Sequence, residues 1–306
     1  MSVSTYKNSY SLSLLITMAL LLLGASSCTT DGTSNSAPAD DGGGTPLKIV
    51  SLSGVITEVL FDLGQDDNIV GVDVTSTYPA EGVADKAQLG HTSKLNTEAI
   101  LALQPDIIFC MESEVEKPAL QQLASSGVKV VPVTVSSHLN NSVVLAEQLT
   151  QHLNLDSELQ QQLSAQVESD SVALASFLAS QTEQPRVLFI YARGTSRLFV
   201  SGTDTPVDAM IKLAGGQTAI TGFSDYKELT SESLIAANPE VILMFSSGLA
   251  SLDGVEGLKQ IPGIDQTEAY KSERVIAMDG HYLSSFGPRC GAAALQLAQS
   301  LHPKPE

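Results

Sequence analysis

Phenol, imidazole and cationic side chains gather in five loop-like segments of this 306-residue sequence: 74–81, 91–94, 191–197, 222–227 and 279–289. A phenolate oxygen is a hard anionic donor for ferric iron, imidazole is a common metal ligand, and Lys or Arg pairs with carboxylates. On residue type alone, Tyr78 is more simply explained as an exposed loop aromatic before Pro79, where extended backbone is favoured. The segments therefore indicate where a ligand could bind, and the surrounding elements must position them.

Motifs of common enzyme classes do not occur in the chain. It has no GxSxG elbow, HExxH motif, P-loop, GxGxxG turn or CxxC pair. Ser, His and Asp residues are present without a spacing that links them into a triad, although such groups can also meet only in the fold. We therefore predict a binding protein and no enzymatic activity.

Apolar runs that alternate with helical patterns predict the elements that hold these segments. Strands are expected at 47–51, 69–72, 127–135, 186–191, 198–200 and 274–278, and helices at 55–63, 207–213 and 292–301. This alternation is typical of a mainly parallel sheet covered by helices. In such sheets ligands bind beyond the carboxyl ends of the strands, so the five segments are the place to look.

Two stretches of the chain repeat one pattern. Residues 95–109 (LNTEAILALQPDIIF) and 229–243 (LTSESLIAANPEVIL) share Leu, Glu, Ala and Pro at matching positions and end in a strand-like run. Each predicts a short helix, capped by Thr97 or Ser231, that stops near the proline. The repeat predicts an α/β fold with two duplicated lobes and mainly parallel sheets.

A stretch without Gly or Pro runs from 133 to 184, between the two copies. Asn141 and Asp156 are the expected helix N-caps, and apolar residues at 159, 163, 167, 174 and 178 follow a helical period. We predict an N-terminal lobe at 47–155, one long connecting helix at 156–184 and a C-terminal lobe at 185–306. A ligand cleft is expected between the lobes.

The first 46 residues do not suit a folded core. An apolar run at 12–23 follows Lys7, and small residues lead into Cys28. This pattern predicts a signal peptide at 1–27 and lipidation of Cys28, with an ordinary secretory signal as the alternative. Residues 28–46 are rich in Gly, Ser, Thr and Asp and predict a flexible tether. We expect a membrane-anchored lipoprotein on the periplasmic or cell-surface side.

Charge and cysteine content narrow the partners. The chain has 34 acidic and 16 basic residues, a formal net charge of −18. Nucleic acid is disfavoured as a partner, because proteins that bind it are usually basic. Cys110 and Cys290 fall in opposite halves, so separate buried thiols are expected even where oxidation is permitted.

The order of these segments resembles one family of binding proteins. The leader, KIVSLSGVITEVLFDLG (48–64), VGVDVTSTYP (70–79), the first repeat copy, the long helix and FGPR (286–289) are together similar to substrate-binding proteins of ABC importers. The likeness is to those for haem, cobalamin and ferric siderophores, and it covers 47–301. It implies two lobes joined by a rigid helix, and a monomer that serves a permease dimer.

Three stretches are closest to the haem-binding branch: TSTYP (75–79), GTDTPVDAMIKLAGG (202–216) and SSFGPR (284–289). In that branch the loop tyrosine binds the haem iron, which implies Tyr78 as the metal ligand; tyrosine-ligated haem is an established type. Lys227 matches a basic residue that lies at the ligand in related proteins, and a cation suits a propionate. The remaining residues expected at the ligand are His91, Tyr191, Arg193, Tyr226, Tyr282 and Arg289.

A sixth iron ligand is not evident. Some related haem binders supply a histidine from the second lobe, but the corresponding loop here, YARGTSR (191–197), has none. His91 or His281 could take that role. Five-coordinate haem bound through tyrosine is the default expectation.

Glu98 and Glu232 hold the same place in the two repeat copies. In the family the matching acids pair with arginines of the permease, which implies that these two residues dock the protein on its transporter. A first-turn glutamate is also favoured by the helix dipole, and both explanations can hold.

The leading hypothesis is capture of haem and its delivery to an importer. Cobalamin or a ferric siderophore is the alternative in the same family, and the lack of Trp weighs slightly against cobalamin. Capture of Zn²⁺ or Mn²⁺ through His91, His281 and a carboxylate is a further alternative. A haem-modifying enzyme is the alternative of another class.

Overall fold

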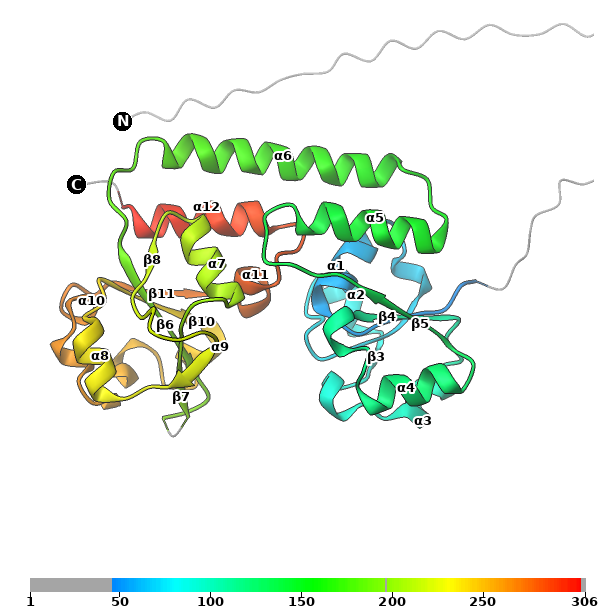
Figure 1. Ribbon diagram of the computed structural model, residues 1–306, viewed down its shortest axis with the longest axis horizontal. Helices are drawn as coiled ribbons and strands as arrows, with labels where there is room; N and C mark the ends of the chain where they lie inside the picture. Colours follow the sequence, from blue (N-terminus) through cyan, green and yellow to red (C-terminus); the bar gives the residue numbers. More distant parts are fainter. Residues whose placement is uncertain (1–45, 196, 304–306) are drawn as a thin grey trace, which may run out of the picture. The chain divides into compact units, whose positions relative to one another are not determined.

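The computed structural model describes residues 46–195 and 197–303. The predicted signal peptide, the lipidation site at Cys28 and the predicted tether up to residue 45 lie outside these ranges. Within them, two α/β lobes are bridged by one long helix, which confirms the predicted fold class (Figure 1). No helix in this part of the chain is long and apolar enough to span a bilayer.

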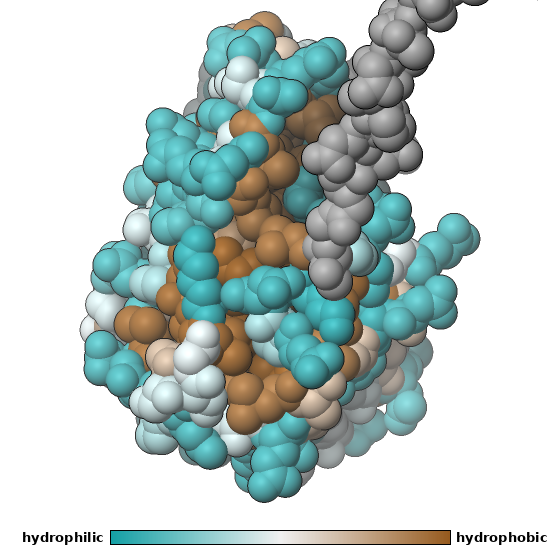
Figure 2. Space-filling view, turned by 90° about the vertical axis from the view of Figure 1, so that its right-hand side faces the viewer, coloured by the Kyte–Doolittle hydropathy of each residue, from teal (hydrophilic) through white to brown (hydrophobic). Residues whose placement is uncertain are grey.

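The N-terminal lobe is built on a five-stranded parallel sheet in the order β3-β2-β1-β4-β5. Its strands are β1 (Ile49–Ser51), β2 (Ile69–Val72), β3 (Ala87–Gln88), β4 (Ile107–Met111) and β5 (Lys129–Val133). Its helices are α1 (Gly54–Asp62), α2 (Ala80–Ala84), α3 (Thr97–Ala102), α4 (Pro118–Ser125) and α5 (Asn141–Leu153). Residues of α1 and α5 form a core on one face of the sheet, and residues of α3 and α4 form another. Seen end-on, this lobe has a largely polar outline around a central apolar area (Figure 2).

The C-terminal lobe has a six-stranded mixed sheet in the order β11-β10-β6-β7-β9, with β8 paired to β6. Its strands are β6 (Arg186–Ala192), β7 (Leu198–Ser201), β8 (Gln217–Thr218), β9 (Tyr226–Glu228), β10 (Val241–Phe245) and β11 (Val275–Met278). Its helices are α7 (Pro206–Leu213), α8 (Ser231–Ala237), α9 (Ser246–Ala250), α10 (Glu268–Lys271), α11 (Gly280–Ser284) and α12 (Cys290–Leu301). The 3-10 helices of the two lobes are η1 (Asp66–Asn68), η2 (Thr92–Lys94), η3 (Glu112–Glu114), η4 (Val255–Gln260) and η5 (Ile264–Gln266).

Two antiparallel pairings distinguish this second sheet from the first. Strand β7 runs antiparallel to both β6 and β9. Strand β9 falls in the segment expected to be a loop, because its three residues are all exposed and give no apolar run. The partner strand, which only the fold supplies, therefore decides its conformation.

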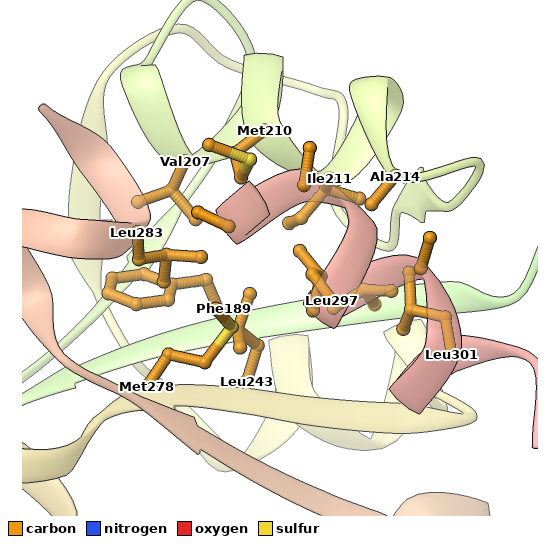
Figure 3. Close-up of a cluster of buried hydrophobic side chains, with 14 of the residues drawn as sticks. Phe189, Val207, Met210, Ile211, Ala214, Leu243, Met278, Leu283, Leu297 and Leu301 are labelled. Atoms are coloured by element: carbon orange, nitrogen blue, oxygen red, sulfur yellow. The ribbon is translucent and has the colours of Figure 1, made fainter. Parts of the chain in front are cut away.

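The helices α7, α11 and α12 share one core with the C-terminal sheet (Figure 3). Leu283 of α11 and Leu297 of α12 meet Phe189 and Met278 from the sheet there. This packing fixes the short helix α11 and the start of α12, which carry several candidate ligand residues.

The connecting helix α6 (Glu158–Leu178) spans both lobes. Its 21 residues rise roughly 31 Å at 1.5 Å each. Leu163 and Val167 pack into the N-terminal core, and Leu174 packs into the C-terminal core. Leu159, expected in the same stripe, is 40% exposed. Because each end of one rigid helix belongs to a different core, α6 holds the lobes side by side (Figure 1).

The predicted N-caps are wrong by one residue in every case. The helices α3, α5, α6 and α8 are capped by Asn96, Asn140, Ser157 and Thr230. Asn, Ser, Thr and Asp are all favourable caps, so adjacent candidates cannot be ranked from sequence. Asn141 instead accepts from the backbone N–H of Ser136 (2.7 Å) and donates to the carbonyl of Phe286 (3.0 Å), which links the lobes.

The two cysteines of the lobes behave as expected. Cys110 and Cys290 are both free and buried, which confirms the prediction of separate thiols. Burial raises the pKa of the Cys110 thiol to about 11 and that of Cys290 to about 12. Both are therefore protonated at neutral pH, and neither is a reactive thiolate.

Candidate functional site in the cleft between the lobes

A cleft with a volume of about 950 Å³ lies between the lobes. Ligand pockets typically measure 300–1,000 Å³, so this space suits a large organic ligand. One wall comes from the N-terminal segments that follow β1, β2, β4 and β5, and the other from the start of α7, the end of β10 and α11. These are largely carboxyl ends of parallel strands, as the alternation of elements predicts.

Hydroxyl groups dominate the lining of this cleft. Seven serines and three threonines line it, and all its lining residues belong to the described part of the chain. No Lys or Arg is among them, and the two carboxylates are Glu112 and Asp279. Glu112 accepts from the Thr134 hydroxyl (3.0 Å), and Asp279 accepts from the backbone N–H of Tyr282 (2.9 Å). The lining is thus polar but not basic.

A buried carboxylate holds the loop that leads to Tyr78. Asp73 is 2% exposed and accepts hydrogen bonds from the hydroxyls of Thr75 (2.7 Å) and Ser76 (2.8 Å). The Thr75 hydroxyl in turn accepts from the backbone N–H of Gly54, the first residue of α1 (2.8 Å). Burial raises the pKa of Asp73, and the bonds from Thr75 and Ser76 oppose that rise. The loop is therefore tied to the start of α1.

Tyr78 lies at the end of this loop and contacts the other lobe. Its neighbour Thr77 lines the cleft, and the Tyr78 side chain is 42% exposed. The guanidinium carbon of Arg289 lies 3.5 Å from the centroid of the Tyr78 ring and 5.0 Å from that of Tyr282. The fold therefore brings together three of the predicted ligand residues, Tyr78, Tyr282 and Arg289, through cation–π contacts.

Glu58 of α1 anchors that arginine, and sequence reasoning did not single it out. It is 2% exposed. Its Oε1 accepts from Nε of Arg289 (2.6 Å), and its Oε2 accepts from Nη2 of Arg289 (3.2 Å) and Nε2 of His281 (2.7 Å). Burial favours the neutral acid, but these two partners outweigh it and hold the pKa of Glu58 below its ordinary value. The available signal was an acid inside the apolar run Val55–Leu60.

Asp62 stands one helical turn after Glu58 on α1. Burial, with the negative charge of Glu58 adding to it, raises the pKa of Asp62 to about 6 from 3.8, and Arg289 opposes the rise. The folded state therefore holds this proton more tightly than the unfolded chain does. Its contribution to stability is complete below pH 3.8 and is lost as pH rises through about 6.

We therefore expect Asp62→Asn to gain stability relative to the wild type as pH rises from about 4 to 6, with no further gain above pH 7. An amide cannot ionise, so it avoids the penalty that the carboxylate meets next to Glu58. Urea unfolding of both proteins at pH 4, 5, 6 and 7 measures the difference. A difference that stays constant over this range would contradict the prediction.

Aromatic rings line the C-terminal side near the cleft. Phe245, which lines the cleft, lies 4.8 Å from Phe189 and 6.1 Å from Tyr191 between ring centroids. Tyr226 lies 6.5 Å from Phe189, and burial raises its pKa although Thr205 donates or accepts a hydrogen bond there. Arg193 donates from Nε to the Tyr191 hydroxyl. These predicted residues thus share one aromatic surface.

Two predicted residues are not brought to the cleft lining. Lys227 follows Tyr226 on β9 and so faces the other side of the strand, where its Nζ lies 4.5 Å from the Phe223 ring centroid. His91 is exposed, and its Nδ1 accepts from the backbone N–H of Ser93 (3.1 Å). His281 lines the cleft with its Nε2 bonded to Glu58. In 46–195 and 197–303, no three His, Cys, Asp or Glu side chains form a metal-binding group.

The two predicted docking acids occupy equivalent exposed positions. Glu98 is in the first turn of α3, and Glu232 is in the first turn of α8. Each helix leads into a central strand of its sheet, β4 or β10. The sequence repeat is therefore also a structural repeat.

Comparison with known proteins identifies the family. The model of the periplasmic binding protein family matches residues 49–282. The chain belongs to this family. The most similar structures include the periplasmic haem-binding protein RhuT of Roseiflexus sp. RS-1 in its apo form, with 36% identity and a TM-score of 0.79. That match covers 84% of this chain and 98% of RhuT.

Sequence relatives of this periplasmic binding protein carry a second kind of name. The ABC transporter substrate-binding lipoprotein YvrC of Bacillus subtilis is 26% identical over 84% of this chain and 81% of its own length. The vitamin B12-binding protein of Photorhabdus laumondii is 25% identical, with 84% and 88% covered. The family is one of substrate-binding proteins rather than enzymes. Its members here are named for haem or for cobalamin.

Proposed function

We propose that this periplasmic binding protein captures haem in the cleft between its lobes and delivers it to the permease of an ABC importer. The observation that carries the proposal is Tyr78, a partly exposed phenol beside the cleft, backed by a guanidinium from the opposite lobe. Across residues 46–195 and 197–303, no hydrogen bond to the Tyr78 hydroxyl is found. A phenol so placed suits ferric iron, which prefers hard oxygen donors.

The second lobe supplies a surface for the porphyrin. A flat conjugated ring packs well on aromatic side chains, and Phe245 with Tyr191 provides them next to the cleft. Arg289 and Arg193 stand outside the cleft lining, so haem bound here would turn its propionates toward the rim to reach them. The likeness to RhuT supports the same ligand.

Cobalamin is the second candidate, and the cleft lining favours it. Cobalamin carries several amide groups and no pair of carboxylates, so a lining of hydroxyls with Glu112, Asp279 and no Lys or Arg suits its hydrogen-bonding needs. The name of the Photorhabdus relative points the same way. Haem remains the first choice because Tyr78 has no evident role toward cobalamin.

Titration of the purified apoprotein with haemin and, separately, with cyanocobalamin tests these alternatives. We expect a saturable Soret band with a high-spin tyrosinate pattern for haemin and a rise in melting temperature on binding. The proposal fails if haemin gives no saturable band while cyanocobalamin raises the melting temperature.

Delivery requires a transporter, and we propose that Glu98 and Glu232 dock on it. Their equivalent exposed positions in two similar lobes suit a symmetric, dimeric permease. We also propose attachment to a membrane through a lipid on Cys28 alone, with the protein acting as a monomer. The family supports a location outside the cytoplasm.

A further inference from the structure

One carboxylate joins the two lobes immediately behind the proposed iron ligand. Glu58 comes from α1 of the N-terminal lobe, whereas its partners His281 and Arg289 come from the C-terminal lobe, 223 and 231 residues later. The side chains of Glu58 and His281 are 2% and 7% exposed, and that of Arg289 is 30% exposed. The contact is therefore a buried one that only this arrangement of the lobes produces.

Arg289 uses different parts of its guanidinium for two purposes. Its edge donates to Glu58 through Nε and Nη2 at 2.6 and 3.2 Å. Its face lies on the Tyr78 ring at 3.5 Å. A planar guanidinium can bond a carboxylate in its plane and stack on an aromatic ring at the same time, which a lysine ammonium cannot do. The orientation that Glu58 imposes on Arg289 thus also fixes the surface on which Tyr78 rests.

Two glycines leave room for this cluster. A Cβ at position 54 would lie 2.7 Å from Cε1 of His281, and a Cβ at position 287 would lie 3.1 Å from Oε2 of Glu58. Larger residues at either place would push the imidazole or the carboxylate away. The local sequence on both lobes is therefore adapted to the Glu58 contacts.

We propose that Glu58 is a positioning residue for Tyr78, acting through Arg289 across the lobe interface. The inference rests on the proposed function, because it assigns a role toward the iron ligand. Glu58 itself does not touch the ligand. It fixes Arg289, Arg289 fixes the phenol ring, and both contacts persist only while the lobes keep this spacing. Any partner that moves the lobes apart must break the Glu58 contacts and thereby loosen the hold on haem.

The test measures haem dissociation and the tyrosinate spectrum in four variants: Glu58→Gln, Arg289→Lys, Arg186→Lys and Tyr78→Phe. We expect Glu58→Gln and Arg289→Lys each to release haem about tenfold or more faster and to alter the tyrosinate bands, as for groups that orient a metal ligand. Arg186→Lys is the matched control, because Arg186 bonds backbone carbonyls at the far end of its strand, and its rate should stay within about twofold of wild type.

Double variants with Tyr78→Phe decide whether the effect passes through Tyr78. In that background, Glu58→Gln and Arg289→Lys should change the rate by no more than about twofold further. Equal effects with and without Tyr78, or a lower melting temperature with wild-type rate and spectrum, would overturn the inference. Arg289→Lys keeps a cation beside Glu58, so it remains informative if Glu58→Gln does not fold. Wild-type protein that binds no haem would overturn the proposed function and this inference together, whereas unaffected variants of a haem-binding wild type overturn the inference alone.

Discussion

Replacing Tyr78 with Phe is expected to weaken haem binding by at least about 100-fold and to abolish the tyrosinate bands of the ferric complex. The substitution removes only the oxygen that would bind iron and leaves the ring that lies on Arg289. Loss of groups that merely orient a metal ligand costs about 10–100-fold, so loss of the ligand should cost at least that upper value. Haemin titration followed by absorbance measures both quantities.

Tyr270→Phe is a matched control for this experiment. Tyr270 belongs to α10 and packs with the core on the other face of the C-terminal sheet, so its hydroxyl should not matter to haem. If Tyr78→Phe bound haem with wild-type affinity and spectrum, another residue would have to be the iron ligand, and the proposed site would be wrong.

Replacing Glu58 with Ala is expected to lower the free energy of unfolding by about 3–5 kcal/mol, the usual cost of removing one partner from a buried ion pair. The guanidinium of Arg289 would lose both of its hydrogen-bond acceptors on Glu58, and His281 would lose its only recorded side-chain partner within the described chain. The two lobes would also lose a direct link. Urea unfolding of the apoprotein measures the difference.

The Glu58 effect should depend on pH in a known direction. The pKa of Glu58 lies below its ordinary 4.5 in the folded state, so the folded protein binds this proton less tightly than the unfolded chain. Its stabilisation is therefore complete above about pH 4.5 and is lost as pH falls through the lower, folded value. Glu58→Ala should differ most from wild type at neutral pH and less in acid.

Glu240→Ala provides the comparison for an exposed pair. Glu240 contacts Arg186 with both side chains more than 40% exposed, and such pairs contribute about 0–1 kcal/mol. If Glu58→Ala cost no more than Glu240→Ala at pH 7, the buried cluster would not stabilise the lobe interface.

Local pattern was sufficient for most individual elements. Buried strands such as β2, β4 and β6 are continuous apolar runs, and each was expected within two residues of its observed bounds. The repeated helix–strand units also appear as α3–β4 and α8–β10. These features could be predicted because apolar periodicity acts over a few residues and does not depend on distant partners.

Partners far apart in the chain could not be predicted in the same way. Strand β9 exists because β7 lies beside it, and Lys227 turns away from Tyr226 because strand residues alternate. Glu58 is the clearest case. Nothing near it explains an acid among Val55, Ile56 and Val59, since its partners follow more than 220 residues later.

The sequence by itself determined the two α/β lobes, the helix between them, the family resemblance and the loops that carry Tyr78, Tyr282 and Arg289. The tertiary structure alone decided that these three side chains meet across the lobe interface and that Glu58 holds them there. The physical reason is that burying a charge is favourable only with a partner, and that partner comes from the opposite lobe.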